Sequence, residues 1–191
     1  YRYEKSRHSI SIFTNKLSLR AGDKMKIELK NIKHYESMSE ETFCFNANLY
    51  VDGKKVGEVS NRGNGGCHQY SFNVNTEKEL DKWCKENLPK WSMGDDQEYE
   101  TDLELHISNL VADFLDTKHL KSLFNKAVIV MDDTCEEGQC WQYKFSKYKL
   151  MPKSQLIDAV FESVTKDKRF RNPIILNNMP IEKAKKVYFR V

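Results

Sequence analysis

The feature that most constrains the fold is a change in hydrophobic period near residue 75. Before it, apolar and polar residues alternate through 23–33, 42–51 and 54–60, which is the period of half-buried β-strands. After it, apolar residues recur at the spacing of helices. The sequence therefore predicts an α+β fold, in which an N-terminal antiparallel β-sheet meander packs with helices and with a second β-hairpin in the C-terminal half.

Two alternating runs flank Asp52 and Gly53. An Asp-Gly pair in this setting favours the type I′ turn of a two-residue hairpin, because both residues tolerate positive φ. Tyr70, Phe72 and Val74 alternate once more. We therefore expect a further strand over 70–74 as the last strand of the meander.

The helical half begins with a capping-box pattern. Thr76 is followed three residues later by Glu79, so Thr76 is the expected N-cap of a helix that ends before Pro89. Apolar residues over 103–115 then predict a longer helix. We expect a separate short helix after Thr117.

The second hairpin is expected from an apolar run at 127–131 and an alternating run at 141–145. Alternation places Trp141, Tyr143 and Phe145 on one face, where they are expected in the core. Two more helices and a short strand complete the prediction. They are a helix after Pro152 with Leu156, Ile157, Val160, Phe161 and Val164 facing inward, a strand over 174–176, and a helix after Pro180.

Composition limits the class of protein. The chain has 191 residues, 39% of them hydrophobic and 31% charged, which suits a globular core and excludes low-complexity chains. We expect one domain over 1–191, with a division into a β-rich part over 1–75 and a helix-rich part over 76–191 left open. The longest apolar run is too short to cross a bilayer, and five cysteines do not form a full disulfide framework. We expect a cytoplasmic protein without a membrane partner.

The net charge of +3 conceals a segregation along the chain. Residues 1–75 carry an excess of four basic side chains, 76–140 an excess of nine acidic ones and 141–191 an excess of eight basic ones. Such blocks indicate either faces that meet differently charged partners or a solvated surface whose charges compensate one another.

Four stretches resemble a family of small uncharacterised proteins that bacteriophages and prophages encode. They are SEETFCF at 39–45, YVDGKKVG at 50–57, NRGNGGC at 61–67 and ILNNMPIE at 175–182. The family has no established activity, so the resemblance supplies no catalytic residue. It implies a bacterial host cell and a phage accessory protein that binds a host macromolecule, such as an anti-CRISPR-like inhibitor of a host defence nuclease.

The first candidate site is the glycine-rich loop over 61–68. Glycines allow a close approach of the backbone to a ligand, and consecutive amides beside a guanidinium can bind an anion. The pattern lacks the lysine of a P-loop and the fingerprint of a dinucleotide site. A small enzyme or ligand-binding module at this loop is one interpretation, and a long turn is the other. Its candidate ligand- or partner-binding residues are Arg62, Gly63, Asn64, Gly65, Gly66 and His68.

The second candidate site is basic. Lys166, Lys168, Arg169 and Arg171 follow one another closely in the C-terminal third. Basic side chains can contact the phosphates of a nucleic acid or an acidic protein surface. The partners expected are therefore a host protein, a protein–nucleic-acid complex or a nucleic acid, and the oligomeric state is left open.

Metal and cofactor sites are not expected. Cys67 and His68 could join Cys135 and Cys140 around zinc, but the spacing departs from the usual paired ligands. Four carboxylates within 132–137 could hold Mg²⁺, although a solvated hairpin end has the same composition. No catalytic residue is assigned, and a binding protein is favoured over an enzyme.

Overall fold

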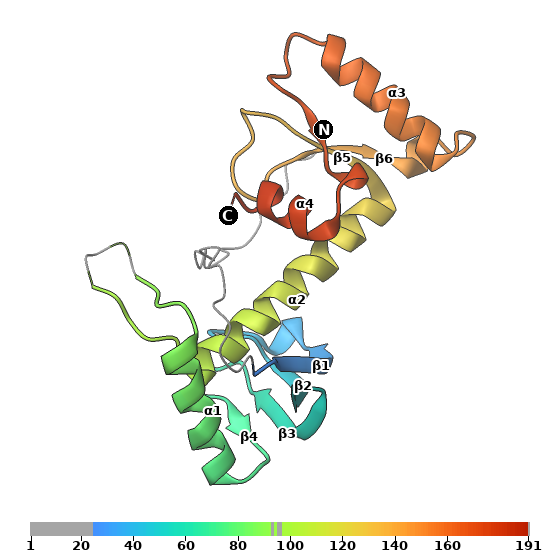
Figure 1. The fold of residues 1–191 in the computed structure, drawn as a ribbon. Coiled ribbons are helices and arrows are strands. Elements are labelled where there is room, and N and C mark those ends of the chain that lie inside the picture. Colours follow the sequence, from blue (N-terminus) through green and yellow to red (C-terminus); the bar gives the residue numbers. More distant parts are fainter. Residues whose placement is uncertain (1–24, 93, 95–96, 191) are drawn as a thin grey trace. The chain divides into compact units, whose positions relative to one another are not determined.

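The structure is a computed structural model that describes residues 25–92, 94 and 97–190. Within these residues the chain forms two compact units that divide inside one long helix, α2 (Leu103–Lys126) (Figure 1). The N-terminal unit ends at Phe114 and the C-terminal unit begins at Leu115. A single domain over the whole chain stays a prediction.

The N-terminal unit contains the predicted meander. Four antiparallel strands lie in the order β1 (Ile27–His34), β2 (Phe45–Val51), β3 (Lys54–Asn61) and β4 (Gln69–Tyr70). Between β2 and β3, Asp52 and Gly53 have φ values of +48° and +78°, as a type I′ turn requires. Inward residues on β2 alternate as predicted, and Phe45, Ala47 and Leu49 are all buried.

The last strand of this sheet is shorter than predicted. Val74 does not continue it but begins helix α1 (Val74–Asn87), and Val74 is exposed. The side chain of Asn73 accepts a hydrogen bond from the backbone N–H of Asn75, so Asn73 is the N-cap and the prediction of Thr76 was wrong. The Asn73 side chain satisfies a backbone N–H in the first turn of the helix. The chain therefore leaves the strand and begins the helix at this residue.

Helix α2 is continuous, and the prediction of a separate helix after Thr117 was wrong. No Gly or Pro interrupts 103–126, and extending a helix costs less free energy than nucleating another. Leu103, Ile107 and Val111 are buried at a spacing of four residues in the N-terminal unit. Leu120 is buried in a core cluster of the C-terminal unit.

The C-terminal unit is a three-stranded antiparallel sheet with helices on both faces. Its order is β6 (Trp141–Lys144), β5 (Ala127–Met131) and β7 (Ile174–Ile175), which confirms the second hairpin. Every residue of β5 is buried. Val128 and Val130 pack in one cluster with helix α3 (Lys153–Lys166). The intervening residues of β5 pack in another cluster with helix α4 (Ile181–Tyr188).

Three short 3₁₀ helices complete the description, η1 (Glu36–Met38), η2 (Phe145–Lys147) and η3 (Leu176–Asn178). The α+β fold with its two antiparallel sheets is thus confirmed. None of the helices in the described residues is long and apolar enough to span a bilayer.

Two aromatic side chains predicted in the core are exposed. Phe161 is half exposed because the buried stripe of α3 passes through Leu156, Val160 and Val164 at intervals of four, one position away from Phe161. Trp141 is also exposed. Its ring lies edge-on against Phe170, with 5.4 Å between the ring centroids.

Asn177 links η3 to the central strand β5. Its Oδ1 accepts a hydrogen bond from the backbone N–H of Ile129 at 2.7 Å, and its Nδ2 donates to the carbonyl of Ala127 at 3.0 Å. The side-chain amide therefore hydrogen-bonds to β5 as the backbone of a neighbouring strand would, and it satisfies two backbone groups of β5.

We predict that Asn177→Ala destabilises the protein, because both backbone groups of β5 lose their partner. The free energy of unfolding should fall by about 1–3 kcal/mol, measured by urea denaturation. Asn178→Ala is the matched control, since Asn178 is the adjacent exposed amide. Equal effects of the two substitutions would contradict this role.

Candidate functional site

The glycine-rich loop connects β3 to β4, at the same end of the sheet as the connection between β1 and β2. His34 pairs with Phe45, and Phe45 pairs with Asn61. The ends of these strands therefore meet, and the connection over 35–44 lies beside the loop over 61–68.

Gly63 joins the two loops. Its carbonyl oxygen accepts hydrogen bonds from the backbone N–H groups of Glu40, Glu41 and Thr42, at 2.8, 2.9 and 3.3 Å. The residue is buried and has φ +88°, and a Cβ built there would lie 2.1 Å from the carbonyl oxygen of Met38. Only glycine fits this position without a shift of the backbone.

Asn61 organises the loop from inside. Its Oδ1 accepts from the backbone N–H of Gly63 at 2.8 Å and from the Thr42 hydroxyl at 2.9 Å. Its Nδ2 donates to the carbonyl of Gly66 at 2.8 Å and to His68 Nδ1 at 2.9 Å. The side chain is buried and uses both its donors and both its acceptor positions, so the loop has one defined shape.

The predicted site residues of the loop do not all face solvent. Arg62 and the segment 64–67 are exposed, whereas Asn61 and Gly63 are buried. A Cβ at Gly65 would lie 2.1 Å from Glu41 Oε2, so a carboxylate of the protein itself already lies against the loop. A carboxylate at this point opposes the binding of an anion.

His68 lies between the loop and helix α2, and only 5% of its side chain is exposed. Its Nε2 is 3.1 Å from Ser108 Oγ, and its backbone N–H donates to Glu104 Oε1 at 2.9 Å. Burial lowers the pKa of His68 below its usual value near 6.5, against the neighbouring carboxylates of Glu104 and Asp102, which raise it. The imidazole is therefore neutral at pH 7.

Ser108, His68 and Glu104 together resemble a catalytic serine with its base and carboxylate. The hydrogen bonds assign the opposite tautomer. Because Asn61 donates to Nδ1, the proton of the neutral ring is on Nε2 and is directed at Ser108 Oγ, so His68 cannot take a proton from this serine. Glu104 Oε1 is 3.6 Å from Nδ1 and is held by the backbone N–H of His68 instead. The contact joins the loop to α2.

Exposed apolar side chains surround the loop. Tyr35, Met38 and Phe43 are 41%, 56% and 42% exposed, and all three come from the connection that Gly63 holds. Ser39 shapes this connection, since its hydroxyl donates to the carbonyl of Tyr35 and accepts from the backbone N–H of Cys44. We call 35–43 together with 62–67 the paired-loop surface.

Sequence reasoning missed the apolar part of the paired-loop surface. The stretch 36–41 reads as a polar loop, and nothing in its pattern says that its one methionine faces solvent. Alternation places Phe43 on the same face as the buried Phe45, so the pattern gave no signal that Phe43 is 42% exposed.

The basic candidate residues lie in the C-terminal unit, and the structure does not place them relative to the loop. Two of them have acidic neighbours. Lys166 Nζ is 3.6 Å from Glu162 Oε2, and Arg169 Nη2 is 2.6 Å from Asp167 Oδ2. Lys168 and Arg171 are exposed. Local carboxylates thus offset part of the positive charge predicted to bind a partner.

The carboxylates at 132–137 are not a uniform solvated group. Asp132 is buried, and it accepts from the hydroxyl and N–H of Thr134, the thiol of Cys135 and the N–H of Arg171. Burial alone would raise the pKa of Asp132, but these hydrogen bonds hold it below its ordinary value. Asp132 therefore shapes the turn of the second hairpin.

The described residues contain no group of three His, Cys, Asp or Glu side chains placed to hold a metal ion. Cys135 is buried and Cys67 is exposed, and both are free thiols, as is Cys140. Burial raises the pKa of Cys135 to about 11, so its thiol stays protonated at neutral pH. Cys44 and Cys84 are also buried.

Charge separates by structural unit. Residues 25–114 carry 10 basic and 17 acidic side chains, whereas residues 115–191 carry 15 basic and 9 acidic ones. The N-terminal unit is therefore acidic and the C-terminal unit basic, so the two present opposite fields to a partner.

We predict that Gly63→Ala destabilises the protein while Gly66→Ala does not. At Gly63 a Cβ would collide with backbone in a left-handed conformation, whereas at Gly66 the nearest atom is 3.8 Å away. Urea denaturation should show a loss of about 1–3 kcal/mol for the first and a change within about 0.5 kcal/mol for the second. An unchanged free energy of unfolding in Gly63→Ala would contradict the role of Gly63 in joining the two loops.

We predict that stability falls as the pH falls below about 6.5. The unfolded chain takes up a proton on His68 near its ordinary pKa, whereas the folded protein does so only at lower pH. The stabilisation is complete above that value and is lost toward the lower folded pKa. His106, whose pKa burial also lowers, adds to the effect.

Replacing His68 with Gln should make this pH dependence shallower. Urea denaturation at a series of pH values measures it. An unchanged slope in the His68→Gln variant would show that the imidazole does not titrate as we expect.

Comparison with protein-family models, with curated proteins and with solved structures found no match to this chain. Conclusions about function therefore rest on the geometry of the two units. In the N-terminal unit that geometry is the rigid paired-loop surface, in which exposed apolar side chains stand beside carboxylates.

Proposed function

We propose that this chain is a non-enzymatic binding protein whose paired-loop surface docks onto a basic surface of a nucleic-acid-binding protein. The observation that carries the proposal is the grouping of three exposed apolar side chains on the connection over 35–44, which Gly63 holds beside the glycine-rich loop. Three exposed glutamates, Glu36, Glu40 and Glu41, lie in the same connection.

The apolar side chains supply an anchor. Apolar groups that lie exposed together favour an interaction site, because burying each of them releases about 25 cal/mol per Å² of apolar area. Aromatic residues and Met are enriched at the centres of protein interfaces. Tyr35, Met38 and Phe43 therefore suit a protein partner with an apolar cavity.

The rigidity of the two loops supports binding. Gly63 accepts three backbone hydrogen bonds and Asn61 makes four. A surface already held in its bound shape loses less conformational entropy on association. The glycines of the loop serve this shape, which accounts for them without a small ligand.

The charge of the N-terminal unit indicates the chemistry of the partner. Residues 25–114 have seven more acidic than basic side chains, so this unit repels nucleic acid and attracts a surface lined with Lys and Arg. Proteins that bind nucleic acids present such surfaces to the phosphates. The carboxylates of the paired-loop surface are suited to the same groups.

The resemblance to phage-encoded proteins suggests where the partner is found. In that setting the partner is a bacterial host protein. A defence nuclease fits best, because it binds nucleic acid in a basic groove and because its inhibition would benefit a phage. Occupation of the groove would keep nucleic acid out by direct competition.

The hydrogen bonds of His68 favour binding over catalysis at this loop. Both ring nitrogens have partners within the protein, and the proton of the ring is directed at Ser108. The alternative, a small enzyme or ligand-binding module, would require this network to open.

The test is affinity capture from a nuclease-treated bacterial lysate. The wild-type chain should retain a nucleic-acid-binding protein that duplex DNA elutes, because DNA competes for the same groove. Met38→Ser with Phe43→Ser should abolish capture. Val74→Ser is the matched control, since Val74 is 61% exposed on α1 of the same unit.

Two outcomes would overturn the proposal. Capture that survives the double substitution would remove the paired-loop surface from the interface. Capture that duplex DNA does not displace would exclude a nucleic-acid groove as the surface bound.

A further inference from the structure

An ordered segment joins β6 to α3 in the C-terminal unit. The backbone N–H of Tyr148 donates to the carbonyl of Phe145, and that of Met151 donates to the carbonyl of Tyr148. Lys153 Nζ lies 4.9 Å from the centroid of the Phe145 ring. Two successive turns and this cation–π contact fix the segment against the start of α3.

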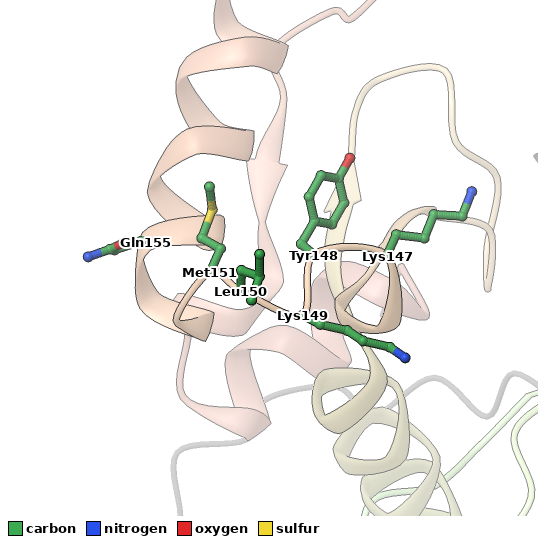
Figure 2. A pocket seen from close by; sticks show the side chains of 6 residues that line it. All are labelled: Lys147, Tyr148, Lys149, Leu150, Met151 and Gln155. Carbon is green, nitrogen blue, oxygen red and sulfur yellow. The ribbon is translucent and has the colours of Figure 1, made fainter.

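The segment exposes large apolar side chains. Leu150 is 102% exposed, and Tyr148 and Met151 are 42% and 41% exposed. They line a shallow hollow of about 340 Å³ together with Lys147, Lys149 and Gln155. In Figure 2 the Met151 and Tyr148 side chains stand on either side of Leu150, and the two lysines extend away on the Tyr148 side.

The charge of the segment has one sign. Residues 138–157 contain four lysines and no Asp or Glu. Within the part of the chain that the structure describes, Lys147 and Lys149 form no ion pair. They differ in this from Lys166, which lies beside a carboxylate of its own helix.

We propose that this basic–apolar segment, residues 147–151 with Gln155, is a docking site for an acidic amphipathic segment of a partner protein. An apolar side chain of the partner enters the hollow beside Leu150, and its carboxylates meet the ammonium groups of Lys147 and Lys149. The apolar side chains of the segment thus contact an apolar group, and its ammonium groups contact carboxylates.

The hollow favours a protein segment over a flat anionic partner. Its volume of about 340 Å³ exceeds that of one large side chain and leaves room for two neighbouring side chains of a partner segment. A nucleic acid would use the lysines and an aromatic platform and would leave the aliphatic Leu150 without a role.

This site is independent of the paired-loop surface. It lies in the other structural unit, and its charge is of the opposite sign. The chain therefore offers one surface to a basic partner and another to an acidic one, as a protein that joins two partners would.

A random peptide display library tests the proposal. Peptides are selected on the immobilised wild-type chain with soluble Leu150→Ser chain in excess as competitor. The enriched peptides should combine Asp or Glu with large apolar residues. Their affinity for Leu150→Ser should be on the order of tenfold to a hundredfold lower than for the wild type. Their affinity for the wild type should decrease as the salt concentration rises.

The control variant is Phe161→Ser, which removes another exposed apolar side chain from the same unit and should leave the affinity unchanged. Lys147→Glu with Lys149→Glu should abolish binding of the acidic peptides. Because these side chains are exposed, their replacement should leave the urea denaturation midpoint of the chain unchanged, so that a loss of binding is not a loss of fold.

Three results would overturn the proposal. The first is a selection that yields no peptide whose binding depends on Leu150, and the second is a selection that yields peptides poor in acidic residues. The third is binding of phosphatidylserine vesicles or duplex DNA that depends on Leu150 while no peptide binds, which would assign the segment to a membrane or to nucleic acid. The Met38 and Phe43 variants should retain peptide binding, which separates this test from that of the paired-loop surface.

Discussion

Buried backbone groups that strand pairing does not satisfy need other hydrogen-bond partners, and three short polar side chains supply several of them. Asn61 satisfies the glycine-rich loop, Asp132 satisfies the turn of the second hairpin, and Asn177 satisfies two groups of β5. An unpaired buried N–H or carbonyl costs about as much as several such bonds gain. The loops of both units therefore keep one shape, because these side chains make the backbone hydrogen bonds that a neighbouring strand would otherwise make.

The rigidity that follows has a functional consequence. With its backbone held by Asn61 and Gly63, the loop pair can present Tyr35, Met38 and Phe43 to solvent without collapsing over them. The turn segment before α3 does the same for Leu150 through its own hydrogen bonds. In the C-terminal unit the exposed apolar group lies beside lysines, and on the paired-loop surface three exposed glutamates outnumber the exposed Arg62. Each surface thus combines apolar side chains with a net charge that selects its partner.

The sequence predicted much of the fold, because period and turn chemistry are local. The strands of the meander, the turn at Asp52 and Gly53, the second hairpin and helix α3 follow from patterns that a few neighbouring residues set. The errors arose where local signals competed. Thr76 and Asn73 both suit an N-cap, and the backbone at Asn73 decided between them. Phe161 is apolar like its neighbours on α3, but it lies on a different side of the helix from Leu156, Val160 and Val164. Packing against β5 decides which side of the helix is buried.

The candidate site divides in the same way. The sequence by itself determined that a glycine-rich loop ends the meander, that the charges form blocks and that the chain is α+β. Only the tertiary structure decided that Gly63 packs against Met38, that Asn61 sets the tautomer of His68, and that Leu150 is fully exposed in the same segment as Lys147 and Lys149. These features depend on residues far apart in the chain or on which face a side chain takes. Hydrophobic period reports burial along one element, whereas contacts between elements are set by the packing that brings them together.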